Sequence, residues 1–192
     1  MKKFMRGLLG SVAAMAMFGS GVSASLAGNL KMPTKLKTIH KVECIGADGQ
    51  VKWVEEIHNL VVTAGLNDLL AKYFKGSSYT AAWYVGLKGT GTVAAGDTMA
   101  SHSGWAEIVA YSESVRQTLT LGTPASGSVD NSASRAVFSI NGNATVDGAF
   151  VATDSTKSGT TGILYGASSF SSSRAVISGD TLNVTITLSV AP

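Results

Sequence analysis

The sequence contains one cysteine and three prolines in 192 residues, and it has few charged side chains. The single cysteine, Cys44, excludes an intrachain disulfide and a cysteine-cluster metal site, and no histidine or arginine beside it indicates a reactive thiol. We therefore expect Cys44 to be a small apolar strand residue. Charged residues make up 14% of the chain, against about 25% in an average soluble protein. Low charge is typical of proteins whose surface is covered by neighbouring subunits, and also of extracellular β proteins.

Acidic residues are absent from residues 1–41, which hold seven of the fifteen basic residues. Residues 42–192 carry eight basic and twelve acidic side chains, a net charge of −4. A basic arm on a mildly acidic body is attracted to acidic protein, phosphate or anionic lipid. The body has no basic stripe interleaved with aromatic residues and no recognisable nucleic-acid-binding motif, so we do not expect a nucleic-acid partner.

The N-terminal stretch lacks an apolar run long enough to span a membrane. In MKKFMRGLLGSVAAMAMFGSGVSASLAGN the apolar run from Leu8 to Phe18 has about 11 residues, whereas a spanning helix needs roughly 20. The stretch is also similar to a secretory signal, with a basic start and small residues that would allow cleavage after Ala24 or Ala27. The alternative is a retained Gly/Ala/Met-rich arm whose small side chains allow close approach to a partner.

Alternating apolar residues and turn residues predict a β-rich body from Thr38 onward. Residues 38–58 indicate a hairpin around an Asp48-Gly49 turn. Strand patterns then follow in residues 80–88, 106–111, 115–121, 135–140, 144–153, 162–170, 174–178 and 181–190. This spacing predicts an antiparallel β-sandwich, either jelly-roll or immunoglobulin-like. The expected domains are a basic, Gly/Ala-rich, extended N-terminal arm (1–37) and the sandwich (38–192).

One short helix is expected within this body. Residues at helical spacing form a single apolar face, and they are Leu66, Leu69, Leu70, Tyr73 and Phe74. Thr63 is a suitable N-cap and Gly76 a suitable C-cap. The N-cap, the apolar face and the C-cap therefore all indicate one helix between Thr63 and Gly76.

No residue pattern indicates an active site or a cofactor. One loop contains several polar residues of catalytic type, namely Asp97, Ser101, His102, Ser103 and Glu107. It lacks the strained Gly-flanked turn that usually carries a nucleophilic serine, so we expect loop-ordering hydrogen bonds there. His40 and His58 lie on opposite arms of the hairpin, and two histidines without a third ligand make a poor metal site. We expect both to be exposed strand residues, and no catalytic, cofactor-binding or metal-binding residues.

Two pieces of the body are specific in their order and spacing. Trp83-Tyr84-Val85-Gly86-Leu87 is followed by Asp97-Thr98-Met99, and Asp154-Ser155-Thr156-Lys157 is followed by Gly159-Thr160-Thr161-Gly162. With the segments around them, across residues 38–192, they resemble a family of small structural proteins of tailed bacteriophages, described as capsid decoration, cement or minor head proteins. The resemblance implies a β-rich domain without enzymatic activity that binds the assembled head. Members of that family begin close to the first strand, whereas this chain carries some 37 residues before it.

The resemblance also bears on the N-terminal arm. Because virions are released by lysis rather than export, a phage shell protein needs no secretory signal, which favours a retained arm. The implied location is the capsid surface of the virion, and the implied partners are the major capsid protein and neighbouring copies of this chain, with no membrane. The arm residues expected to make these contacts are Lys2, Lys3, Arg6, Leu8, Leu9, Met15, Met17, Phe18, Lys31, Lys35 and Lys37. Loops 88–104 and 153–162 are second candidates, because they are long, polar and Gly-rich.

Two other functions stay open at this point. A secreted, periplasmic or surface adhesion or fibre module would lose its first 24 or 27 residues as a signal peptide. A hydrolase would use His102 together with a neighbouring serine.

Overall fold

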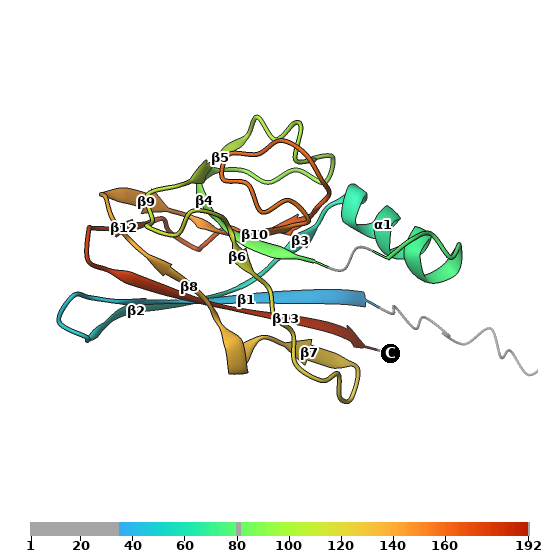
Figure 1. The fold of residues 1–192 in the computed structure, drawn as a ribbon, viewed down its shortest axis with the longest axis horizontal. Coiled ribbons are helices and arrows are strands. Elements are labelled where there is room, and N and C mark those ends of the chain that lie inside the picture. The colour runs from blue at the N-terminus through green and yellow to red at the C-terminus, as the bar shows by residue number, and fades with distance from the viewer. Residues whose placement is uncertain (1–34, 80–81, 192) are drawn as a thin grey trace, which may run out of the picture. The chain divides into compact units, whose positions relative to one another are not determined.

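The structure is a computed structural model that describes residues 35–79 and 82–191. These residues form two antiparallel sheets that lie face to face, with one α-helix beside them (Figure 1). The architecture confirms the expected mainly β, antiparallel sandwich with one short helix. The strand order within the sheets decides which segments meet at each end of the molecule.

The first sheet is built on the two longest strands. β1 (Lys35–Ile45) pairs antiparallel with β13 (Thr181–Ala191) along its whole length. β2 (Val51–His58) returns beside β1 and forms the predicted hairpin, whose turn contains Gly49 at a positive φ of 78°. The other side of β13 pairs with β7 (Ser128–Asp130) and, farther along, with β8 (Ala136–Ser139).

The second sheet has the order β3–β11–β10–β4–β5, and β6 also pairs with β4. Its strands are β3 (Leu60–Val61), β4 (Tyr84–Gly91), β5 (Trp105–Ile108), β6 (Gln117–Thr118), β10 (Gly148–Ala152) and β11 (Leu164–Ala167). A separate ribbon consists of β9 (Ala144–Val146) and β12 (Arg174–Val176). A 3₁₀ turn, Ser132–Ser134, links β7 to β8.

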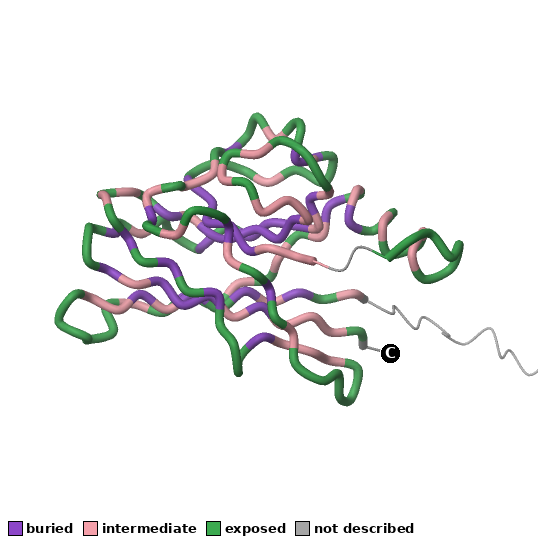
Figure 2. Tube along the Cα trace, in the orientation of Figure 1, coloured by how far each residue is buried: buried purple, intermediate pink, exposed green. Residues whose placement is uncertain are grey.

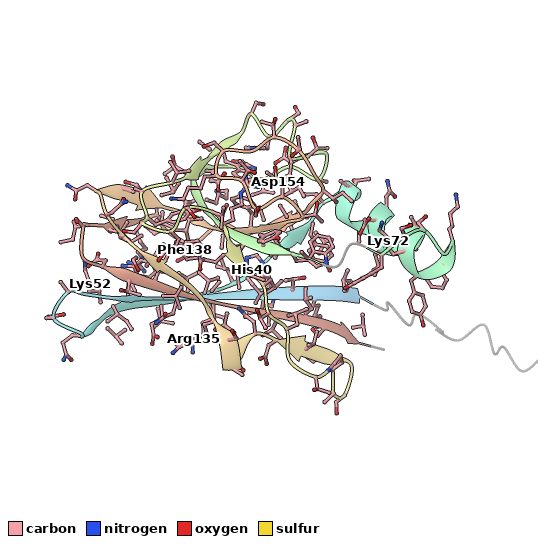
Figure 3. The ribbon with its side chains drawn as sticks, in the orientation of Figure 1. His40, Lys52, Lys72, Arg135, Phe138 and Asp154 are labelled. Atoms are coloured by element: carbon pink, nitrogen blue, oxygen red, sulfur yellow. The ribbon has the colours of Figure 1, made fainter. Side chains whose placement is uncertain are left out.

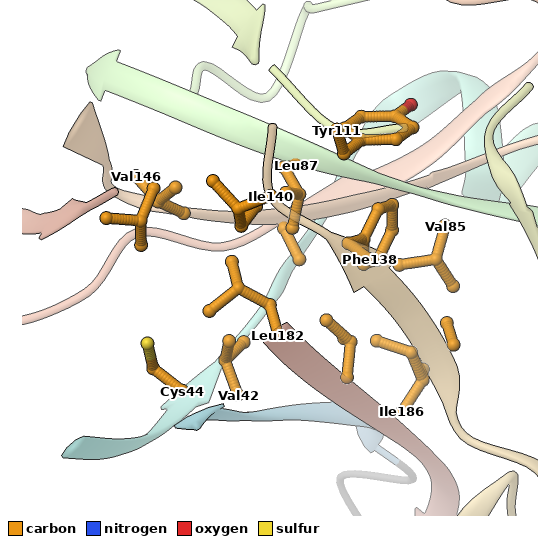
Figure 4. Packing of buried hydrophobic residues seen from close by; sticks show 14 of the residues in the cluster. Val42, Cys44, Val85, Leu87, Tyr111, Phe138, Ile140, Val146, Leu182 and Ile186 are labelled. Atoms are coloured by element: carbon orange, nitrogen blue, oxygen red, sulfur yellow. The ribbon is translucent and has the colours of Figure 1, made fainter. Parts of the chain in front are cut away.

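The main core lies between the two sheets. Figure 4 shows side chains of both sheets meeting there, including Val42, Leu182 and Phe138 from the first sheet and Val85 from the second. Strand β10 is buried on both of its faces, because Phe150 belongs to a second cluster on the outer side of its sheet. The second sheet is therefore covered twice, by the first sheet and by the loops outside it, as the burial pattern in Figure 2 shows.

Alternation of inward and outward residues is confirmed where the sequence pattern was clearest. Leu182, Val184 and Ile186 are all fully buried on β13. Cys44 is fully buried as an apolar strand residue, as expected, and burial raises the pKa of its thiol to about 11.

The expected N-cap of the helix was wrong. The helix begins at Thr63 with Val62 in the cap position, and no side chain caps it. Strand β7 has three half-buried residues without alternation, so the sequence pattern did not indicate it. β1 begins at Lys35, so the last three residues of the expected arm (1–37) lie in this strand.

Candidate docking surface

Helix α1 (Thr63–Phe74) presents its apolar face to solvent. The side chains of this face are 41% to 79% exposed, and we call them the α1 patch: Leu66, Leu69, Leu70, Tyr73 and Phe74. In Figure 1 the helix extends away from the two sheets, and in Figure 2 its residues are mostly exposed beyond the first turn. The periodicity correctly predicted a helix, but the described residues do not cover its apolar face.

The first turn of α1 fixes the helix to the second sheet. Gly65 is its only buried residue, and a Cβ at this position would overlap the backbone carbonyl of Tyr165 on β11. The backbone N–H of Val62 donates to that same carbonyl at 3.1 Å, and the N–H of Thr63 donates to the carbonyl of Ala95 at 2.9 Å. Because the close approach at Gly65 brings only the first turn onto β11, the later turns are directed away from the core.

The end of α1 is also defined. Gly76 has a φ of 67°, the left-handed conformation that commonly follows a helix C-terminus. The rings of Tyr73 and Phe74 contact each other edge to face, with centroids 4.9 Å apart. Two adjacent exposed aromatic rings at a fixed helix end make a defined apolar surface, and such patches mark interaction sites on soluble proteins.

An apolar cavity of about 240 Å³ lies between α1 and the adjacent end of the sandwich. Leu69 lines it from the helix, Leu36 from β1 and Leu188 from β13. Trp83 and Tyr165 line it from the second sheet, and their rings pack edge to face with centroids 5.6 Å apart. A hollow of about 250 Å³ next to β7 also has Leu36 and Leu188 in its wall, so the apolar lining continues across this end of the molecule.

The first described residue of the chain lies at this same end. Lys35 is the first residue of β1, and its neighbour Leu36 lines both the apolar cavity beside α1 and the hollow next to β7. Lys37 is exposed on β1. The remaining expected contact residues lie outside the described residues, and they are Lys2, Lys3, Arg6, Leu8, Leu9, Met15, Met17, Phe18 and Lys31.

The polar loop around His102 forms a hydrogen-bonded structure. The Asp97 carboxylate accepts from the indole N–H of Trp105 at 2.9 Å and from the backbone N–H of Ala94 at 3.0 Å. His102 stacks on Trp105 at 4.1 Å between ring centroids, and its Nδ1 lies 3.1 Å from the Trp105 carbonyl oxygen. Within the described chain no hydrogen bond joins His102 to a serine, and these contacts fit a loop-ordering role.

The two hairpin histidines lie on opposite faces of the first sheet. His58 pairs with Ile39, whereas His40 pairs with Ile57, so the neighbouring strands direct the two rings to different sides. His58 is exposed, as expected, but His40 is completely buried, and the expectation of exposure was wrong for it. Figure 3 places His40 between the two sheets. The alternation of β1 explains this, because His40 shares its face with Val42 and Cys44.

Sequence reasoning missed two buried cations that hold the loops outside the second sheet. Arg116 is 1% exposed and makes paired hydrogen bonds with Glu107, at 2.9 Å and 2.8 Å. Its guanidinium also donates to the carbonyls of Asp154 at 2.7 Å and Gly159 at 3.0 Å. Lys88, fully buried, pairs with Asp147 at 2.8 Å.

Loop 153–162 is held by these contacts and by its own. The Thr161 hydroxyl and the Thr156 backbone N–H both donate to the Asp154 carboxylate and lower its pKa. Asp154 lies among the loops outside the second sheet (Figure 3). We call the contacts of Arg116 with this loop and with Glu107 the Arg116 clamp. The sequence shows an arginine inside a strand pattern, but the partners of Arg116 are 9 to 43 residues away along the chain.

Among residues 35–79 and 82–191, no group of three or more His, Cys, Asp or Glu side chains is placed to hold a metal ion. In that same part of the chain, no helix has the length and apolar character needed to cross a membrane. No protein-family model matches the sequence, and no curated protein matches it. Among the described residues, the α1 patch and the apolar cavity beneath it form the candidate docking surface.

Proposed function

We propose that this chain is a structural protein of a bacteriophage virion, a capsid decoration or cement protein that binds the assembled head and stabilises it. The observation that carries the proposal is the exposed apolar face of α1, which lies beside an apolar cavity at one end of the β-sandwich. The sequence resemblance to head-associated phage proteins supplies the partner, which is the major capsid protein. The low charge of the body suits a protein covered by neighbouring subunits.

The segments that carry the resemblance have structural positions that support it. Trp83 lines the apolar cavity, and residues 84–87 form the start of β4. Asp97 holds Trp105, and Asp154 lies in the loop that Arg116 clamps. These residues contribute to the end of the sandwich beside α1 and to loops 88–104 and 153–162. Such positions are expected of residues that support a binding surface.

The mechanism follows from linkage. A protein that binds across a junction between capsid subunits stabilises the assembled shell, because separating the subunits must also break its own contacts. Many equivalent sites on one lattice add through multivalency, so each contact can be modest. In this proposal the sandwich lies on the shell, and the basic arm lies across acidic surface of the capsid protein, where its lysines steer association.

Removal of residues 1–34 tests the role of the arm. This truncation keeps β1 whole, because the strand begins at Lys35. We expect the truncated protein to bind assembled heads at least about tenfold more weakly in a titration, the loss of about 1.4 kcal/mol of binding free energy. Circular dichroism shows whether the sandwich is retained. A full-length variant with Lys2, Lys3 and Arg6 replaced by glutamine isolates the charge contribution, and unchanged occupancy by both proteins would refute the role of the arm.

The signal-like opening of the chain favours a second candidate, a secreted or surface adhesion or fibre module. The mass of the N-terminus of material purified from its natural source separates the two functions. Retention of residues 1–34 supports the shell protein, whereas a start near Ser25 or Gly28 supports the secreted module.

A further inference from the structure

Helix α1 is amphipathic in the opposite sense to an ordinary surface helix, which turns its apolar stripe toward the core. The side chains of its two charged residues, Asp68 and Lys72, are only 10% and 22% exposed, and both residues line the cavity beneath the helix. Every exposed residue of the helix is uncharged, and these are Thr63, Leu66, Asn67, Leu69, Leu70, Tyr73 and Phe74. The face that meets solvent is therefore the face that suits an apolar partner.

We propose that the α1 patch packs against the α1 patch of a second copy of this chain, with the two helices antiparallel about a two-fold axis at Leu70. The proposal concerns the free protein and does not depend on the proposed function. A two-fold contact uses the same surface on both copies, so that surface must be complementary to itself. Charge, residue order, area and access each meet this requirement.

The charge of the exposed face favours a second copy. Two copies of this uncharged face bring no like charges together, whereas a basic or acidic partner would find no ion pair on it. A helix that lies on a lipid surface usually carries basic residues on its polar face. Lys72 is instead directed to the Asp68 carboxylate, at 3.7 Å, and to the Ser78 carbonyl. The face therefore fits an uncharged apolar protein surface, and a second α1 patch is such a surface.

The order of residues along α1 fits an antiparallel pair. With the axis at Leu70, Leu66 of each copy lies opposite Phe74 of the other, so an aromatic ring meets a smaller side chain at both ends of the pair. Tyr73 lies opposite Asn67, whose amide provides the hydrogen-bond partner that a buried tyrosine hydroxyl needs. Large and small side chains of the two faces thus alternate, as close packing at an interface requires.

The exposed area matches a small stable interface. Tyr73 and Phe74 are 79% and 74% exposed, and Tyr79, which follows the helix, is 74% exposed. An aromatic side chain buries about 150–250 Å², so these three rings offer roughly 450 Å² in each copy. The three leucines of the patch, 41% to 53% exposed, add to this area. Two copies together approach the roughly 1,200 Å² at which specific interfaces begin.

The attachment of α1 leaves access for a second helix. The close approach to β11 is at Gly65 in the first turn, and the helix extends from there away from the two sheets (Figure 1). In an antiparallel pair the two first turns lie at opposite ends of a contact about 18 Å long, which separates the two sandwiches. Such a dimer carries two basic arms, and two linked attachments to one shell would add through multivalency.

The mass of the full chain in solution tests the inference. By light scattering at micromolar concentration, the wild-type protein is expected to have twice the chain mass of 19.7 kDa. Leu70→Asp places a charge from each copy at the axis and is expected to weaken the dimer at least about tenfold. Val51→Asp is the matched control, because Val51 is 54% exposed and Leu70 is 53% exposed, and it is expected to leave the dimer unchanged. Circular dichroism shows that both variants keep the fold.

Crosslinking tests the position of the axis. Leu70→Cys is expected to give a disulfide between two copies on mild oxidation at micromolar protein, because the axis brings this position of one copy next to the same position of the other. Val51→Cys is the control, since Val51 begins β2 at the opposite end from α1 (Figure 1). The native Cys44 is fully buried and present in both variants. A crosslinked yield no higher than that of the control contradicts the proposed axis.

Removal of residues 1–34 separates the α1 contact from other causes of self-association. The truncated protein is expected to remain a dimer that Leu70→Asp dissociates. A full-length monomer, a dimer that Leu70→Asp leaves intact, or a dimer that is lost with residues 1–34 each overturns the proposal. A full-length monomer that forms dimers only after the truncation would show instead that the chain covers its own patch. None of these measurements uses capsids, so failure here is distinct from failure of the proposed function.

Discussion

Replacing Arg116 with methionine is expected to lower the free energy of unfolding by about 3–5 kcal/mol, measured by urea denaturation. The guanidinium is buried, and it joins Glu107 to the carbonyls of Asp154 and Gly159. Methionine fills much of the same volume but leaves the Glu107 carboxylate, whose side chain is 6% exposed, without its cation. A buried charge that loses its partner costs far more than the pair contributed.

Two controls separate this effect from a general loss of an arginine. Arg135→Met removes the cation of an exposed pair with Glu43, 3.0 Å apart, and is expected to change stability by about 1 kcal/mol or less. Combining Arg116→Met with Glu107→Gln removes the orphaned charge and is expected to recover part of the loss. A change below about 1 kcal/mol for Arg116→Met alone would contradict the clamp described for loop 153–162.

Stability is also expected to fall as the pH is lowered from about 6.5, because of His40. Burial lowers the pKa of His40 from 6.5 to about 3. The Ser168 hydroxyl donates to the Ala149 carbonyl, so His40 Nδ1 donates to the Ser168 oxygen at 2.8 Å. The other ring nitrogen, Nε2, is buried without a partner among the described residues, and a proton there would have no acceptor. The folded protein therefore keeps this ring neutral.

The sign of the pH effect follows from proton uptake. As the pH falls through 6.5 the unfolded chain binds a proton at His40, whereas the folded chain does not until about pH 3. The unfolded state is thus favoured by roughly 1 kcal/mol per pH unit across that interval. Asp130, Asp154 and Asp180 have lowered pKa values and add their own loss only as the pH falls below their ordinary value of 3.8. The interval from pH 6 to 4.5 isolates the histidine.

Urea denaturation of His40→Asn across this interval is the test. Asparagine retains a polar atom near the position of Nδ1 but does not titrate, so its curve is expected to lose this part of the pH dependence, whatever its absolute stability. His58→Asn, at an exposed site, is the matched control and is expected to keep the wild-type slope. Equal slopes for wild type and His40→Asn would show that His40 does not remain neutral.

Elements fixed by local pattern were predictable from the sequence. The alternation of β13 was predictable because one face of that strand is buried against the other sheet. The turn was predictable because Asp48-Gly49 is a residue pair that favours tight hairpin turns. The same reasoning, applied to the parity of β1, would have placed His40 inside with Val42 and Cys44. Exposure was expected for His40 because histidine is polar, although its position in the alternation of β1 places it on the buried face.

Features that depend on distant partners were not predictable. The periodicity of α1 shows which residues share a face, but only the close approach of Gly65 to β11 determines that this face is left uncovered by the described residues. The burial of Arg116 depends on carbonyls 38 and 43 residues away, and the burial of Lys88 depends on Asp147, 59 residues away. Local patterns carry no information on such contacts.

The most direct test of the proposed function is imaging of intact phage particles that carry this gene product. We expect density for the β-sandwich on the outer surface of the shell, repeated with the capsid lattice, and a bound polypeptide that still contains residues 1–34. The contradicting result is a protein that starts near Ser25 or Gly28, is found free in the medium, and leaves no density on any particle.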